Sequence, residues 1–137
     1  MNPLRWLALI VCACLGVGCA SAQKDTMTAE FALSSATSLC FKTIDGVDQV
    51  VTDRIRVKLL NGDHQGAIQD YADYKPKIEK ARGACNTAED VYENADKERQ
   101  AAAKINKWDN FNAWLPALLQ ASSAVAQAVS DIKGLVQ

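Results

Sequence analysis

The sequence has little of what catalytic and nucleic-acid-binding sites are built from. It contains a single histidine, and its 15 Lys and Arg residues are balanced by 16 Asp and Glu residues. A nucleic-acid-binding surface needs a clustered basic excess, which this balance does not supply. The haem-attachment motif Cys-x-x-Cys-His and the Glu-x-x-His pairs of di-iron bundles are absent as well. We therefore expect no nucleic acid, metal or other cofactor, and no enzymatic activity.

Acidic residues are also missing from residues 1–22, which carry one positive charge, Arg5, before an apolar run over residues 6–15. A short basic start, an apolar stretch too short to span a bilayer and small residues after it are typical of a bacterial secretory signal. A buried core helix is the alternative interpretation. The small residues at 20–22 predict cleavage before Gln23 by ordinary signal peptidase.

A second cleavage site is indicated by the run Leu15-Gly16-Val17-Gly18-Cys19, which resembles the lipobox of bacterial lipoproteins. The run departs from that family at Gly16, where Leu is usual. The resemblance implies removal of residues 1–18 and addition of diacylglycerol and an amino-terminal acyl chain such as palmitate to Cys19, which would anchor the protein in a membrane. Ala20 is not the Asp that retains such proteins at the inner membrane, so the resemblance implies the outer membrane. Without the lipid, the protein would be a simple soluble periplasmic or secreted protein.

Two cysteines remain after Cys12, Cys14 and Cys19 are assigned to the signal segment or the anchor. These two, Cys40 and Cys85, are an even pair, which in an exported protein predicts a disulfide.

Apolar and small residues recur at alternating spacings of three and four over three stretches, 33–55, 67–102 and 108–136. This spacing keeps them on one face of a helix, and no comparable alternation of period two predicts a strand. We therefore expect an all-α fold, an antiparallel bundle of three long helices, or four, over residues 29–137. Residues 19–28 are expected to form the anchor and a short tether.

The Asn61-Gly62-Asp63 sequence supplies a glycine stop and an Asp cap, so it predicts a turn between the first two helices. In an antiparallel hairpin about this turn, opposite residues have numbers that sum to about 125, as those of Cys40 and Cys85 do. The two cysteines would then face each other ~33 Å from the turn at the α-helical rise. A bridge between them would stabilise the fold by about 4 kcal/mol in the chain-entropy model.

Two prolines, Pro76 and Pro116, interrupt the second and third periodic stretches, and each removes a backbone hydrogen-bond donor. Because the periodicity continues across both, we predict kinks or short helix restarts rather than long loops. Residues 103–110 are predicted to connect the second and third helices, and Asp25 is a candidate cap of the first.

The third helix carries no charged residue between Asn110 and Ser130, and a row of alanines lies beside its main apolar stripe. A helix that is apolar around most of its circumference is buried in its own bundle, bound to a partner, or in lipid. Burial is the first interpretation, and docking of an envelope protein is the second. The predicted partner-binding residues are Trp108, Phe111, Trp114, Ala117, Ala121, Ala124 and Ala128.

Few other residues suggest chemistry. His64 is predicted to be a solvated turn residue, since no second histidine or cysteine stands at ligand spacing. Arg99 falls on the apolar side of the second helix, and we expect it to reach solvent along its own stem. An anionic ligand is the alternative partner for its guanidinium.

The function that these features favour is a non-enzymatic, periplasmic protein tethered to the outer membrane, which binds another envelope protein. In broad character the chain resembles small helical lipoproteins such as secretion pilotins and exclusion or immunity lipoproteins. The alternative is a carrier of an apolar small molecule between the kinked helices. That alternative predicts a cavity in the bundle core lined by Tyr71, Tyr74, Leu115 and Leu118.

Overall fold

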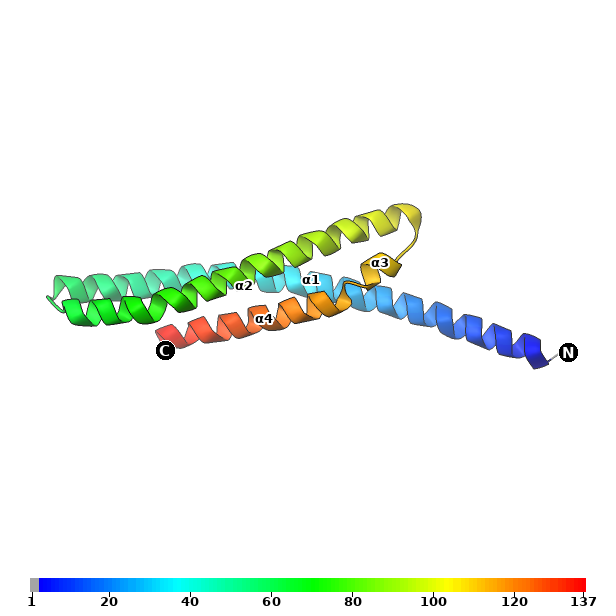
Figure 1. The fold of residues 1–137 in the computed structure, drawn as a ribbon, viewed down its shortest axis with the longest axis horizontal. Coiled ribbons are helices and arrows are strands. Elements are labelled where there is room, and N and C mark those ends of the chain that lie inside the picture. The colour runs from blue at the N-terminus through cyan, green and yellow to red at the C-terminus, as the bar shows by residue number, and fades with distance from the viewer. Residues whose placement is uncertain (1–2) are drawn as a thin grey trace.

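The computed structural model describes the backbone of residues 3–137 and the side chains of residues 21–137. These residues form four α-helices and a final 3-10 turn, α1 (Pro3–Leu60), α2 (His64–Ile105), α3 (Asp109–Asn112), α4 (Leu115–Lys133) and η1 (Gly134–Val136). Figure 1 shows α1 and α2 as a long antiparallel hairpin with α4 lying along it. The predicted all-α bundle of three long helices is therefore confirmed, and the short α3 is a fourth.

The segment expected to be a tether, residues 19–28, is helical throughout, because it lies within α1. α1 passes through Asp25 without interruption, so Asp25 does not cap a helix there. Thr26 is fully buried, and its hydroxyl donates a 2.7 Å hydrogen bond to the carbonyl oxygen of Ala22. The bundle therefore begins before residue 29. The lipobox-like side chains around Cys19 lie outside the described residues.

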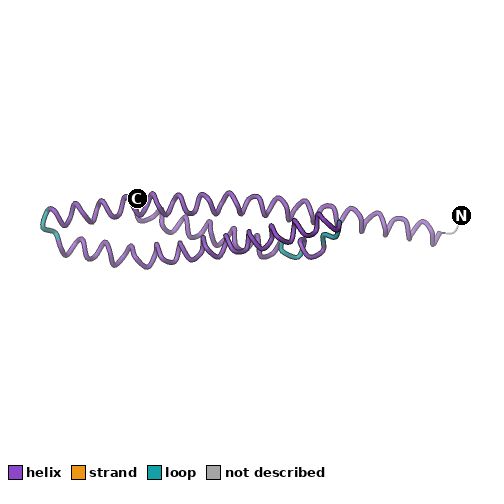
Figure 2. The backbone as a smooth tube through the Cα atoms, turned by 90° about the horizontal axis from the view of Figure 1, so that it is seen from above, coloured by secondary structure: helices purple, strands orange, loops and turns teal. Residues whose placement is uncertain are grey.

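The turn between α1 and α2 lies at the predicted place. Gly62 has a φ of 80°, in the left-handed region that glycine adopts without steric cost. The side chain of Asp63 accepts a 2.9 Å hydrogen bond from the backbone nitrogen of Gly66, which satisfies one free donor at the start of α2. Figure 2 shows this turn as one of the few breaks between helices.

The disulfide between Cys40 and Cys85 is present, with 6.1 Å between the two Cα atoms. Both residues are fully buried, and they belong to the same apolar core as residues of α4. The pairing predicted from the numbering of the hairpin is confirmed.

The two prolines lie in different settings. α2 is one continuous helix through Pro76, whereas Pro116 lies in the first turn of α4, where its missing N–H leaves no helical bond unmade. The helix restart predicted at Pro116 is therefore confirmed. The connection predicted over residues 103–110 is shorter than expected, because α2 continues to Ile105 and ends in the left-handed backbone of Asn106.

α4 packs between α1 and α2 and closes one side of the hairpin, so all three long helices contact one another. The largest fully buried apolar side chains come from α1, α3 and α4, and they are Leu33, Ile44, Phe111, Leu118, Val125 and Ile132. α2 contributes Cys85 and buried alanines to the same core. The hairpin is longer than α4. Figures 1 and 2 both show its turn extending beyond the C-terminus.

Among the described residues, no helix contains a stretch that is both long enough and apolar enough to cross a membrane.

Candidate interaction surface on α4

The aromatic residues before α4 attach it to the bundle. Phe111 is fully buried, and its ring meets that of Trp108 edge to face with 5.8 Å between centroids. The indole nitrogen of Trp108 donates a 3.2 Å hydrogen bond to the side-chain oxygen of Asn106, and Trp114 packs half-buried against the core. Phe111 is therefore a core residue in this fold, and the prediction that it binds a partner is corrected.

One side of α4 supplies core residues, which are Leu118, Ala121, Val125, Ala128, Val129 and Ile132. Ala121 and Ala128 were predicted to bind a partner, but they lie inside the bundle with under a tenth of their surface exposed. Burial therefore accounts for part of the apolar circumference, and of the seven predicted residues only Ala124 is exposed, while Trp108, Trp114 and Ala117 are half-buried.

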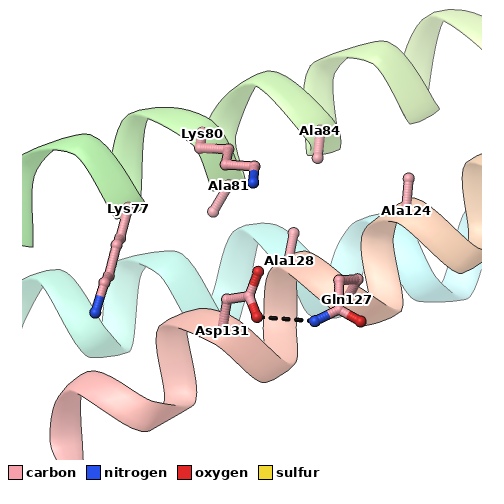
Figure 3. A pocket seen from close by; sticks show the side chains of 8 residues that line it. All are labelled: Lys77, Lys80, Ala81, Ala84, Ala124, Gln127, Ala128 and Asp131. Carbon is pink, nitrogen blue, oxygen red and sulfur yellow. Dashed lines mark hydrogen bonds between the residues drawn. The ribbon is translucent and has the colours of Figure 1, made fainter.

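A groove of about 490 Å³ runs between α2 and α4. It is lined by Lys77, Lys80, Ala81 and Ala84 from α2 and by Ala124, Gln127, Ala128 and Asp131 from α4. Figure 3 shows the alanines facing one another across it, with Lys77 and Lys80 on one side. On the other side Gln127 donates a 2.8 Å hydrogen bond to Asp131. Alanine side chains are too short to fill the space between the two helices, which leaves the groove open.

A second groove, of about 390 Å³, lies on the other flank of α4, against α1. Ala36 and Leu39 of α1 face Val125, Ala126, Val129, Ser130 and Lys133 of α4 across it. Leu39 is 55% exposed, as is Leu119 on α4. The exposed residues of α4 and these two flanking grooves are together called the α4 surface below.

A charged cluster joins α1 to α2 at the other end of the hairpin from its turn. The guanidinium of Arg99 lies 3.1 Å from the carboxylate of Glu30 and also binds Asp96, one turn before it on α2. Glu30 is only 4% exposed. Arg99 therefore pairs with carboxylates of its own chain. Its side chain also reaches solvent, as predicted, with 35% of its surface exposed.

Burial raises the pKa of Glu30 above its ordinary value, because the charged form loses its hydration, although Arg99 offsets part of this effect. Burial acts in the same direction on Asp96, but the hydrogen bonds that its carboxylate accepts from Arg99 and Gln100 outweigh it and lower the pKa of Asp96. Hydrogen bonds to both carboxylates raise the pKa of Arg99. The cluster thus holds a charged arginine against two acids and fastens α1 to α2.

Sequence reasoning missed Glu30. It lies on the buried side of α1, between Thr26 and Leu33, and roughly opposite Arg99 in the hairpin. A signal was available in the sequence. Glu30 is an acid among apolar positions of the first helix, and Arg99 stands at about the same level of the second.

His64 is exposed at the start of α2, as predicted. No group of three or more possible metal-ligating side chains occurs in the described part of the chain. None of the grooves described above is lined by Tyr71, Tyr74, Leu115 or Leu118, the residues predicted to surround a ligand in the core. Instead Tyr74 and Leu118 are buried by packing, and Tyr71 is half-exposed.

Comparisons with protein-family models, with curated proteins and with solved structures give no match to this chain. Its function must therefore be inferred from its own residues.

Proposed function

We propose that this protein is exported from a bacterial cytoplasm, is tethered to the outer membrane through Cys19, and binds another envelope protein without catalysing a reaction. The observation that carries the binding part is the α4 surface, a helix that has no charged residue from Leu115 to Ser130 and an open groove on each flank. The export part is carried by the signal-like pattern of residues 1–22.

The disulfide supports export. Structural disulfides persist in oxidising compartments such as the periplasm, and Cys40 and Cys85 lie at bonding distance and fully buried. The sequence pattern before them is that of a secretory signal, and the run ending at Cys19 resembles a lipobox. These two independent features favour the same compartment.

The α4 surface supports a helical partner. Its exposed residues include the small or aliphatic Leu119, Ala124 and Ala126, against which a second helix can bury its apolar side. Gln120, Ser123 and Gln127 are exposed between them and supply neutral polar contacts. The margins of the grooves carry Lys77, Lys80 and Lys133 as well as Asp131, which would orient a partner rather than supply most of its affinity. We therefore infer an amphipathic helix of an envelope protein as the bound element.

The export and anchoring proposal is tested by intact mass spectrometry of the protein extracted from membranes. We expect an amino terminus at Cys19 carrying the mass of the lipid, and a mass two hydrogens lower than that of the reduced chain because of the disulfide. A terminus at Gln23 would support secretion without a lipid anchor. An unprocessed chain in the cytoplasmic fraction would contradict export.

The binding proposal is tested with Ala124→Arg, since Ala124 is exposed and lines the α2–α4 groove. A photo-crosslinking residue at position 126 should capture a specific envelope protein in cells, and Ala124→Arg should abolish that capture by filling the groove with a charged side chain. Ala72→Arg, on an exposed part of α2 away from α4, is the matched control and should leave it unchanged. Equal capture by both variants would contradict the proposal. Ala121→Arg is unsuitable because Ala121 is buried.

A further inference from the structure

One face of the α1–α2 hairpin is not covered by α4. Two adjoining grooves, of about 440 and 320 Å³, lie on this face, and both include Tyr92 in their lining. Neither is lined by any residue of α4. On α1 they involve Ser34 and Ser38, whereas Ala36 and Leu39 line the groove toward α4. The hairpin therefore presents a separate surface, called the open face below.

Large apolar side chains are exposed on the open face. Phe31 is 77% exposed and Met27 is 37% exposed, and both line the smaller groove. Phe41 and Tyr92 are half-buried in the larger one. Apolar groups gathered around a groove in this way mark an interaction site more often than isolated exposed side chains do.

A row of α1 residues runs along the open face. It consists of Met27, Phe31, Ser34, Ser38, Phe41 and Asp45, which line the two grooves, and of the exposed Lys24 one turn before them, with spacings that alternate between three and four. This spacing keeps them on one side of the helix over ~33 Å. Glu30, Thr37 and Lys42 line the grooves beside this row. The row is chemically self-complementary about its centre, Ser34, because a positive charge stands at one end and a negative charge at the other.

Reversing the row onto itself brings unlike or compatible groups together at every step. Lys24 meets Asp45, and Met27 meets Phe41. Phe31, the most exposed aromatic residue, meets Ser38, whose small side chain leaves room for a ring. At the centre Ser34 meets its own counterpart, so two helix backbones can approach closely there.

The residues of α2 beside Ser34 are arranged symmetrically as well. Cys40 lies opposite Cys85 in the hairpin, so Ser34 lies at the level of about residue 91. Glu89 and Tyr92, the two residues of α2 in the larger groove, stand on either side of that level. When the face is turned over about this centre, each Tyr92 hydroxyl comes beside the Glu89 carboxylate of the other copy, which can accept its hydrogen bond.

We propose that the open face binds a second copy of this chain, with the two α1 helices antiparallel about a two-fold axis at Ser34. The two hairpins then stack face to face, α1 against α1 and α2 against α2, and each α4 lies on the outer side of its own hairpin. A two-fold interface requires a surface that complements itself. Because the row on α1 has this property, we infer a second copy of the chain as the occupant. The open face provides both members of each charge pair and both members of the Phe31–Ser38 contact.

This dimer leaves the α4 surface free, so it does not depend on the proposed function. The two proposals can fail separately, because Phe31→Ala tests self-association and Ala124→Arg tests partner capture.

The proposal is tested by sedimentation velocity of the oxidised full chain at micromolar concentration. We expect a dimer, and we expect Phe31→Ala to raise its dissociation constant by about tenfold or more, because each dimer loses two buried rings. Phe31 is mostly exposed within one copy, so its loss leaves the fold intact. Leu119→Ala, an exposed apolar residue of α4, is the control and should remain dimeric. A monomeric parent chain, or a Phe31→Ala variant as dimeric as the parent, would overturn the proposal.

The antiparallel register has its own test. Lys24→Asp and Asp45→Lys should each weaken the dimer several-fold, and the double variant should restore affinity to within about twofold of the parent. Ser34→Cys should form a covalent dimer under mild oxidation well above the background of the parent chain, and Ser123→Cys on α4 should not. This register would be overturned if the double variant did not restore affinity. It would also be overturned if Ser34→Cys and Ser123→Cys cross-linked equally.

Discussion

Two parts of the α1–α2 hairpin differ in one respect, the presence of α4. In the covered section, along which α4 lies, Leu33, Ile44 and Ile78 are each at most 5% exposed. In the tip, residues 56–72, Leu60 is 80% exposed and Ile68 is 64% exposed. The border is marked by a 3.1 Å hydrogen bond from Arg54 to the carbonyl oxygen of Leu135, close to the C-terminus.

The difference shows that the apolar residues of α1 and α2 that α4 covers become core, whereas similar residues with no third helix over them stay exposed, as Leu60 and Ile68 do in the tip and Phe31 does on the open face. Two packed helices bury only the residues along their line of contact. A third helix also buries the residues on one side of that line. The tip is held across this line by polar groups, since Lys58 binds Asp70 at 2.8 Å there. We therefore expect stability to be concentrated in the covered section, and the following changes test this.

The largest expected effect is loss of the disulfide. Replacing both Cys40 and Cys85 by Ala should lower the free energy of unfolding by about 4 kcal/mol, because the unfolded chain regains the freedom of a loop spanning a sequence separation of 45 residues. Urea denaturation measures this loss, and reduction of the unchanged protein should produce a similar one. A loss below about 1 kcal/mol would mean that packing against α4 alone holds the covered section.

A direct comparison of the two parts comes from truncating one apolar residue in each. Ile132→Ala, at a fully buried position of α4, should cost about 2–5 kcal/mol because it leaves a cavity. Leu60→Ala in the tip should change the free energy of unfolding by less than about 0.5 kcal/mol. Thermal and urea denaturation of the two variants provide the measurement, and equal costs would remove the distinction between covered section and tip.

The ion pair at the end of the covered section predicts a smaller, pH-dependent effect. Burial raises the pKa of Glu30 above 4.5, so over the interval from 4.5 to the raised pKa the folded protein retains a proton that the unfolded chain has released. The free energy of unfolding should therefore fall as pH rises through that interval, and Glu30→Gln should lack this fall. Asp96 acts oppositely, since the stability from its lowered pKa is present above 3.8 and is lost as pH falls.

Urea denaturation at a series of pH values, from below 4.5 to neutrality, distinguishes these contributions. The two contributions are separated by their pH ranges, because that of Glu30 appears above pH 4.5 and that of Asp96 is lost as pH falls below 3.8. Parallel pH profiles for the two proteins would show that Glu30 does not titrate differently on folding.

The smallest effect is expected at the border of the two parts. Arg54→Ala removes one exposed hydrogen bond to Leu135 and should cost about 0.5–1 kcal/mol or less. Hydrogen exchange should accelerate in η1 and in the last turn of α4, while exchange near Cys40 remains unchanged. Faster exchange throughout the covered section would show that the border bond supports the whole bundle.

Much of the fold could be predicted because the evidence for it is local. Alternating spacings of three and four predict helices, Gly62 and Asp63 predict a turn, and the turn then aligns Cys40 with Cys85. The helix boundaries were less accurate. α1 passes through Asp25, and α2 through Pro76, because packing against neighbouring helices outweighs a single capping or helix-breaking residue.

The candidate site was predicted less well. The apolar character of α4 was clear from its lack of charge, but Phe111, Ala121 and Ala128 were predicted to contact a partner and are buried in the bundle. Periodicity does not say which of two adjacent rows on a helix faces its own chain. That choice depends on where α4 lies against the hairpin.

By itself the sequence determined that this chain is helical, that its first two long helices form a hairpin, and that a disulfide joins them. Helical geometry repeats every few residues, so short spacings in the sequence are enough to determine the helices, the turn and the pairing of the cysteines. Only the tertiary structure decided that Arg99 pairs with Glu30, that α4 ends before the tip, and that one face of the hairpin is left open. These properties depend on the distances between residues far apart in the chain and on the lengths of packed helices, which no local pattern encodes.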